Sequence, residues 1–194
     1  MKNLLKFIGF TFLVITLAFT NVDKKTIVID VGHGGHDKGA TANEFNEKDI
    51  ALNIANKIKQ LNENSNLEII LTRDNDEFLS LKDRTKKINK LKPNLVISLH
   101  TNSSYDINKN GKKIFISDKN IQKEKSGHLA MKLLFSLKDK NVEIKKAKFY
   151  ILNNIEYPIA LIELGYLSNK NDREILTTEK GQNELAEAIL SAIK

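Results

Sequence analysis

Four short, mainly apolar runs constrain the fold of this chain more than any other feature. They cover residues 26–31, 67–71, 95–99 and 159–162. Runs of this length, bounded by turn residues, are typical of strands buried on both faces of a sheet. The segments between them are long enough for amphipathic helices. Strands that alternate with helices predict an α/β fold with a mixed, largely parallel central sheet flanked by helices on both faces.

The predicted helices have apolar residues at three- and four-residue spacing. The clearest helix start is Ser80, followed three residues later by Asp83. A serine in this position is typical of a helix N-cap, because its hydroxyl can accept a backbone N–H of the first turn. We predict helices over residues 47–61, 80–91, 122–137 and 179–193, and two further short strands over residues 113–117 and 149–152.

The N-terminus has the composition of a targeting segment. Lys2 and Lys6 precede an uncharged, apolar stretch over residues 7–22. A membrane-spanning helix needs about 20 apolar residues, and this stretch is shorter, which suits a signal peptide. The cleavage signal is weak, so an uncleaved N-terminal membrane anchor remains the alternative for residues 1–22. Either reading predicts export to the periplasm, the cell envelope or the extracellular space. Residues 23–194 form one predicted catalytic domain.

Composition excludes several classes of function. The chain has 194 residues, a formal net charge of +7 and no cysteine. Without cysteine there is no disulfide, no thiolate nucleophile and no cysteine-ligated metal. The basic excess is modest and is not interleaved with aromatic residues, so we predict no nucleic-acid partner. Lysines on solvated helix faces explain most of this charge.

Polar side chains follow three of the predicted strands. His33 comes just after the first strand, His100 directly follows the third, and Glu163 follows the late strand. The carboxyl ends of neighbouring parallel strands meet at one edge of a sheet, where ligands bind. Two histidines and a carboxylate, with no cysteine, are typical of a catalytic zinc site with an open position for water. A further carboxylate could then move a proton during hydrolysis.

The sequence offers two carboxylates as the third metal ligand, Glu44 and Glu47. We favour Glu47, because it begins a predicted helix whose rigid backbone can orient it. An acidic residue stabilised by the helix dipole is the simpler explanation of Glu47 taken alone. His36 is less favoured than His33 as a ligand, since it lies further from the end of the strand.

The motifs at these positions resemble the zinc-dependent N-acetylmuramoyl-L-alanine amidases of the type 3 family. They are VIDVGHGGHDKGA at residues 28–40, EKD at 47–49, LTRD at 71–74, VISLHTN at 96–102 and ALIELGYLSN at 160–169. The resemblance extends from residue 26 to the last residue. It implies zinc ligands at His33, Glu47 and His100, and a catalytic glutamate at Glu163. It also implies peptidoglycan as the substrate, cleaved at the amide between the lactyl group of N-acetylmuramic acid and L-alanine.

Several positions around the motifs carry weaker expectations. Asp30 is expected to accept an N–H from a ligand histidine or to cap the turn, Arg73 to anchor a loop or meet a substrate carboxylate, and Asn102 to reach the substrate. Val31 stands where the family usually has proline, and Tyr166 where it usually has phenylalanine. A zinc carboxypeptidase or another exported metallohydrolase, and a non-catalytic peptidoglycan-binding relative, remain the alternatives. The sequence identifies no protein activator.

Overall fold

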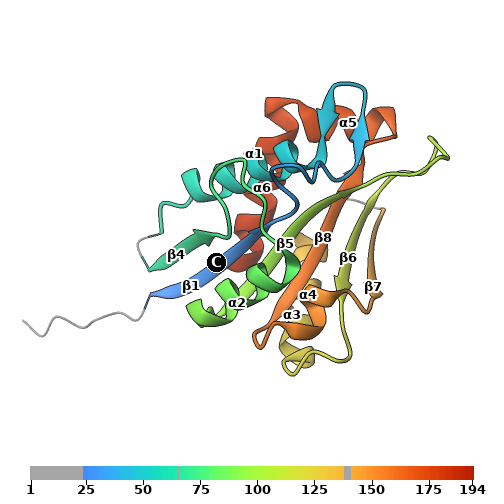
Figure 1. Ribbon diagram of the computed structural model, residues 1–194. Helices are drawn as coiled ribbons and strands as arrows, with labels where there is room; N and C mark the ends of the chain where they lie inside the picture. Colours follow the sequence, from blue (N-terminus) through green and yellow to red (C-terminus); the bar gives the residue numbers. More distant parts are fainter. Residues whose placement is uncertain (1–23, 65, 138–140) are drawn as a thin grey trace, which may run out of the picture.

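A six-stranded sheet forms the centre of the protein, in the order β4-β1-β5-β8-β6-β7 (Figure 1). The computed structural model describes residues 24–64, 66–137 and 141–194. The predicted signal peptide or anchor lies outside the described residues. The strands are β1 (Lys25–Val31), β4 (Leu67–Leu71), β5 (Leu95–Asn102), β6 (Lys112–Ile116), β7 (Val142–Lys146) and β8 (Ile159–Tyr166), and a small hairpin pairs β2 (Thr41–Ala42) with β3 (Phe45–Asn46).

The sheet is mixed and mostly parallel, as the sequence predicts. Strands β4, β1, β5 and β8 pair in parallel, β6 is antiparallel to β8, and β7 is parallel to β6. The one antiparallel pair among the six described strands of this sheet is therefore β6 with β8, the strand that contains Glu163. This arrangement confirms the predicted α/β class with a largely parallel sheet.

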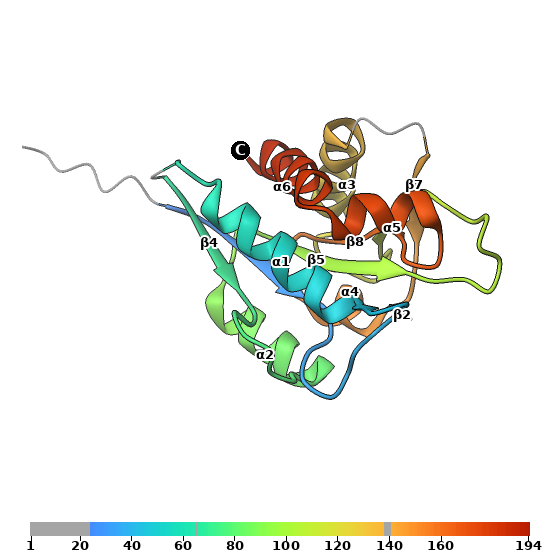
Figure 2. The same cartoon turned by 90° about the horizontal axis from the view of Figure 1, so that it is seen from above.

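Helices cover both faces of the sheet (Figure 2). Helices α1 (Glu47–Gln60), α3 (Lys123–Ser136), α5 (Lys170–Thr177) and α6 (Glu179–Ile193) lie on one side, and α2 (Leu81–Leu91) and α4 (Tyr150–Asn154) lie on the other. The larger core cluster joins α1, α3 and α6 to the sheet and includes Ile27 and Ile29. The smaller cluster includes Val28 and faces α2 and α4. The alternation of neighbouring β1 residues between the two clusters follows from the two-residue period of a strand.

Several predicted elements differ from the structure. Residues 149–152 were predicted as a strand, but α4 is a short helix, because a brief apolar run cannot be assigned by its period alone. The prediction lacked β7, α5 and the β2–β3 hairpin. The N-cap at Ser80 is confirmed, since its side chain accepts from the Asp83 backbone N–H.

Two strands continue beyond their predicted ends, and this places the polar residues more rigidly than expected. His100 lies within β5 and Glu163 lies within β8, where the two are register partners. On the sheet face that packs against α2 and α4, the residues near the start of each strand are apolar. The residues further along each strand on that face are these polar ones. Within the described ranges, no helix is both long and apolar enough to cross a membrane.

Candidate active site

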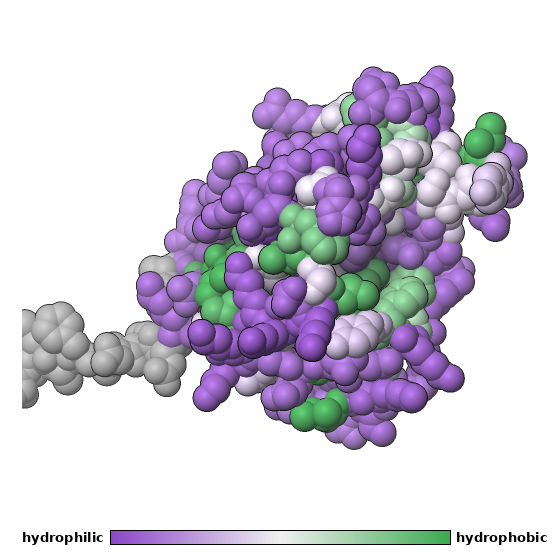
Figure 3. Space-filling model, in the orientation of Figure 1, coloured by the Kyte–Doolittle hydropathy of each residue, from purple (hydrophilic) through white to green (hydrophobic). Residues whose placement is uncertain are grey.

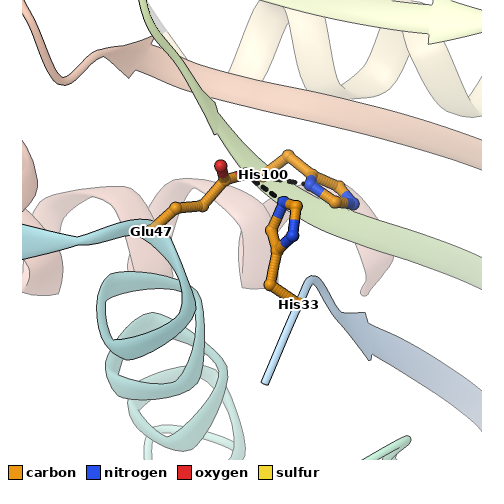
Figure 4. A group of neighbouring side chains, drawn as sticks. All are labelled: His33, Glu47 and His100. Atoms are coloured by element: carbon orange, nitrogen blue, oxygen red, sulfur yellow. Dashed lines mark hydrogen bonds and ion pairs between the residues drawn. The ribbon is translucent and has the colours of Figure 1, made fainter. Parts of the chain in front are cut away.

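Three side chains from separate elements meet at one edge of the sheet (Figure 4). His33 follows β1, Glu47 is the first residue of α1, and His100 lies in β5. Glu47 Oε1 is 3.2 Å from His33 Nε2 and 2.9 Å from His100 Nδ1. The imidazole rings lie edge to face, with centroids 5.0 Å apart. One donor atom from each residue lies within 4.8 Å of the others, so the group can hold a metal ion.

Glu47 is fixed by hydrogen bonds on both carboxylate oxygens. Oε1 accepts from the Thr101 backbone N–H at 2.9 Å, and Oε2 accepts from the Ala40 backbone N–H at 2.7 Å. Burial alone would raise the pKa of this carboxyl, but hydrogen bonds from His100 and His33 hold its pKa well below the usual range. Glu47 is therefore ionised, as a metal ligand must be. The other candidate carboxylate, Glu44, is exposed and lies outside the cluster.

His33 adopts a backbone conformation that few side chains tolerate. Its φ is +57°, in the left-handed region, which costs a non-glycine residue about 1 kcal/mol. The imidazole is oriented by Asp37, whose Oδ2 accepts from His33 Nδ1 at 2.8 Å. Burial lowers the pKa of His33, but contacts with Glu47 and Asp37 outweigh it and raise the pKa above its ordinary value. Asp37 therefore fixes which ring nitrogen faces the cluster.

Two buried arginines hold the loop that contains His33. Arg73 Nε donates to the His33 carbonyl at 2.9 Å, and Arg73 Nη2 donates to the Gly32 carbonyl at 2.8 Å. Arg84 donates to the carbonyls of Val31 and His33. These bonds stabilise the strained turn in one geometry, because a guanidinium can satisfy several carbonyls at fixed angles.

Two glycines leave space that the candidate metal ligands occupy. A Cβ on Gly39 would lie 2.5 Å from Glu47 Oε2 and 2.6 Å from His33 Cδ2. A Cβ on Gly32 would lie 2.6 Å from His100 Cε1. Gly39 also has a φ of +65°, which glycine adopts readily. Gly32 and Gly39 are therefore required by the close approach of the three candidate ligands.

Glu163 lies beside this cluster and is half-buried. Its Oε2 accepts a hydrogen bond from Asn102 Nδ2. Burial raises the pKa of Glu163 above the ordinary glutamate value, although Lys113 and Asn102 oppose the shift. A carboxylate with a raised pKa, held next to a candidate metal site, can accept and return a proton.

The structure corrects the expectation for Asp30 and shows the contacts of Arg73 and Asn102. Asp30 does not support a histidine: its carboxylate accepts from Thr72, Ser98 and Arg84. Arg73 is 1% exposed and donates only to backbone carbonyls, which agrees with the expected loop-anchoring role rather than with contact to a substrate carboxylate. Asn102 contacts Glu163, a partner that the sequence did not indicate.

The roles of two loop residues are also clear from the structure. Asp37, rather than Asp30, accepts the N–H of a candidate ligand histidine. The sequence analysis missed this role, although Asp37 lies only four residues after His33. His36 packs on Phe78, with ring centroids 4.1 Å apart, and is not part of the metal cluster. The sequence also ranks His36 below His33 as a ligand, and His36 lies outside the group of candidate ligands.

A cleft of about 910 Å³ opens over the cluster and Glu163. Its walls include four exposed apolar side chains that lie at or just before the starts of α2 and α4: Phe78, Leu81, Phe149 and Tyr150. Figure 3 shows this face, with apolar side chains gathered near its centre, beside α2 and α4, among mostly hydrophilic ones. The cleft can therefore bring a bulky, partly apolar ligand to the ionisable residues.

Comparison with known proteins assigns the family. Residues 27–194 match the family model described as N-acetylmuramoyl-L-alanine amidase. The chain is 32% identical to the uncharacterized protein YqiI of Bacillus subtilis, over 89% of this chain and 84% of YqiI. It is 31% identical to the probable cell wall amidase LytH of Staphylococcus saprophyticus, over 88% of this chain but 57% of LytH.

A solved structure agrees with the match. The catalytic domain of CwlV, an N-acetylmuramoyl-L-alanine amidase from Bacillus (Paenibacillus) polymyxa, superimposes with a TM-score of 0.79. The two are 33% identical, and the similarity covers 87% of this chain and 96% of that domain. Because the family model matches residues 27–194 and the fold agrees, this protein belongs to the N-acetylmuramoyl-L-alanine amidase family.

Proposed function

We propose that this amidase cleaves peptidoglycan with a zinc ion held by His33, Glu47 and His100, and with Glu163 as the catalytic base. The bond is the amide between the N-acetylmuramoyl lactyl group and L-alanine. The observation that carries the proposal is the convergence of two histidines and two glutamates, from four separate segments of the chain, in the lining of a single cleft.

The donor set suits zinc better than the other common divalent cations. Two imidazoles and one carboxylate, without cysteine, are the ligands of catalytic zinc sites, whereas calcium and magnesium prefer oxygen ligands. When bound, zinc supplies a Lewis acid that polarises a carbonyl and lowers the pKa of water to about 7. The short contacts of Glu47 with both histidines and the space left by Gly39 support the fit of such an ion.

The chain holds the three ligands in place before any metal binds. Asp37 orients His33, and the backbone N–H groups of Ala40 and Thr101 fix the Glu47 carboxylate. Residues that orient metal ligands in this way commonly contribute tenfold to a hundredfold in metal affinity, roughly. We therefore expect tight metal binding to depend on Asp37 as well as on the ligands.

Glu163 performs the proton transfers in this proposal. It accepts a proton from the attacking water as the new C–O bond forms at the lactyl carbonyl. It then gives that proton to the alanine nitrogen as the C–N bond breaks, so the products are a free lactyl carboxylate and a free amino terminus. Asn102 holds the Glu163 carboxylate in position through its hydrogen bond. The raised pKa of Glu163 suits both transfers, because the group must gain and lose a proton in one cycle.

The site of action is part of the same proposal. The uncharged, apolar stretch after Lys2 and Lys6 directs the chain to the export machinery and then remains as an anchor or is removed. The name of LytH, a probable cell wall amidase, supports action at the cell wall. The walls of the cleft fit a glycopeptide, since they combine apolar side chains with ionisable ones.

The experiment that tests the proposal is hydrolysis of purified peptidoglycan sacculi. We expect new L-alanine amino termini, loss of activity with a chelator, recovery with zinc, and one zinc ion bound per chain. Glu163→Gln should bind zinc normally and lose activity by about a thousandfold or more, whereas the exposed Glu44→Gln serves as the matched control. Full activity of zinc-bound Glu163→Gln would refute the assignment of the base. Release of C-terminal amino acids instead of new L-alanine termini would favour a carboxypeptidase.

A further inference from the structure

One row of ionisable residues crosses four neighbouring strands. His100 on β5 is the register partner of Glu163 on β8, Glu163 is the partner of Lys113 on β6, and Lys113 is the partner of Glu143 on β7. Register partners lie on the same face of a sheet, with Cα atoms about 5 Å apart. The row therefore leads from the metal cluster, past the proposed base, to a lysine on the next strand.

The Lys113 ammonium group is held in place beside the site. The side chain is half-buried, Nζ donates to the Tyr166 hydroxyl, and Nζ lies 4.9 Å from the centroid of that ring. Tyr166 is itself buried, with 5% of its surface exposed. A lysine fixed by a phenol in this way loses little conformational freedom when a ligand binds, which favours recognition.

The carboxylates next to Lys113 are engaged elsewhere. Glu163 accepts from Asn102, and Glu143 forms an ion pair with Lys145 at 2.8 Å. Across residues 24–64, 66–137 and 141–194, no carboxylate oxygen lies within 4.0 Å of Lys113 Nζ. A half-buried ammonium with one phenolic partner retains two donor hydrogens for an anionic ligand.

The direction of the reaction decides which part of the substrate reaches Lys113. The leaving nitrogen must approach Glu163 to receive its proton, so the peptide side of the scissile amide lies toward Glu163. Lys113 lies one strand further from the metal ligands in the same direction. A substrate oriented in this way would place its peptide stem, rather than the glycan, over Lys113.

We infer that Lys113 determines substrate specificity by binding a free carboxylate of the peptide stem, close to the L-alanine of the scissile amide. This inference rests on the proposed function, since it uses Glu163 to orient the substrate. The second residue of the stem carries a carboxyl group that is either free or converted to a primary amide. An ammonium group binds the carboxylate by charge and hydrogen bonding, and it loses most of that attraction when the group is amidated.

A purely indirect role of Lys113 would have a different signature. Its positive charge lowers the pKa of Glu163, so its removal could alter the base without any contact with substrate. Such an effect would change kcat, and it would be the same for both forms of the stem. Direct recognition instead changes KM, and only for the form with the free carboxylate.

The test uses two disaccharide tetrapeptides that differ only at the second residue of the stem, one with a free carboxylate and one with its amide. With the native enzyme we expect the free carboxylate to give a KM about tenfold lower, the size of one charge-assisted contact. Lys113→Met should make the two KM values equal, and any change in kcat through the lost charge near Glu163 should be the same for both substrates. Lys113→Arg should keep most of the difference, since it retains the charge.

The matched control is Lys146→Met, which removes the same charge from the neighbouring strand. Lys146 is paired with Asp118 at 3.0 Å, and the alternation along β7 places it on the opposite face from Lys145. This variant should keep the native preference. Equal KM values in the native enzyme, or an unchanged preference in Lys113→Met, would overturn the inference. Neither result affects the proposed function, because that proposal has a separate test. It requires Glu163→Gln to lose kcat on both substrates.

Discussion

Replacing Arg73 by methionine tests whether this residue supports the metal-binding loop or meets the substrate. The side chain is 1% exposed and makes five hydrogen bonds to backbone carbonyls. Two of these carbonyls, of Val31 and His33, also accept from Arg84. The variant therefore leaves three carbonyls, of Gly32, Lys48 and Asn75, without the guanidinium.

The expected loss follows from these three bonds. At about 1 kcal/mol for each hydrogen bond, the free energy of unfolding should fall by about 3 kcal/mol. For a domain of this size the melting temperature should then fall by about 6–12 °C. Zinc affinity should fall as well, because the Arg73 guanidinium bridges the His33 loop and the first turn of α1 through the His33 and Lys48 carbonyls.

The assay is urea unfolding of the metal-free protein, combined with zinc titration and steady-state kinetics. Arg173→Met is the control, since Arg173 donates to Leu167 and Ser168 carbonyls at 2.9 and 3.4 Å, away from the metal cluster. It should cost about 1–2 kcal/mol and leave zinc affinity unchanged. If Arg73→Met keeps its stability within about 1 kcal/mol and only raises KM, the residue binds substrate and the reasoning is refuted.

Three further predictions concern the metal cluster and the base. Asp37→Asn should lower zinc affinity by about tenfold to a hundredfold in competition with a chromophoric chelator, and unchanged affinity would contradict the role of Asp37. Gly39→Ala should lower the zinc content of purified protein, because its Cβ would lie 2.5 Å from Glu47 Oε2; Gly127→Ala, whose Cβ meets nothing within 4 Å, should keep full content. Asn102→Ala removes a hydrogen bond that lowers the pKa of Glu163. The acid limb of the pH profile of kcat/KM should therefore move to higher pH, and a move to lower pH would exclude Glu163 as the base.

Much of the fold could be predicted because the strands and helices have clear local signals. The apolar runs predicted the parallel strands, and Ser80 with Asp83 predicted the start of α2 to the residue. The edge strand β7 was missed because only Val142 and Ile144 in it are apolar and the rest is charged. An exposed, lysine-rich edge strand avoids pairing with other chains, and for that reason it has no hydrophobic signature.

The site was predictable where it depends on the ends of parallel strands, and it was not predictable where it depends on the path of a loop. His33, His100 and Glu163 follow or lie in apolar strands, so the topology alone brings them together. The partner of His33 could not be found in the same way, because Asp37 reaches it only through a turn with two positive φ angles, at Gly34 and Gly35. The contacts of Arg73 could not be predicted for the same reason. They depend on the left-handed backbone conformation of His33, which directs its carbonyl toward the guanidinium.

The position of β8 in the sheet has a consequence for the folding kinetics of the enzyme. This strand, at residues 159–166, lies between β5 and β6, so it joins two groups of strands that precede it in the chain. Until β8 is inserted, β5 and β6 each present an unpaired edge, and contacts of such long sequence separation form slowly. The proposed metal ligands all precede residue 101, whereas the proposed base arrives with β8. An incomplete chain therefore lacks the base, and the capacity to cut the cell wall arises only when the last strand has docked.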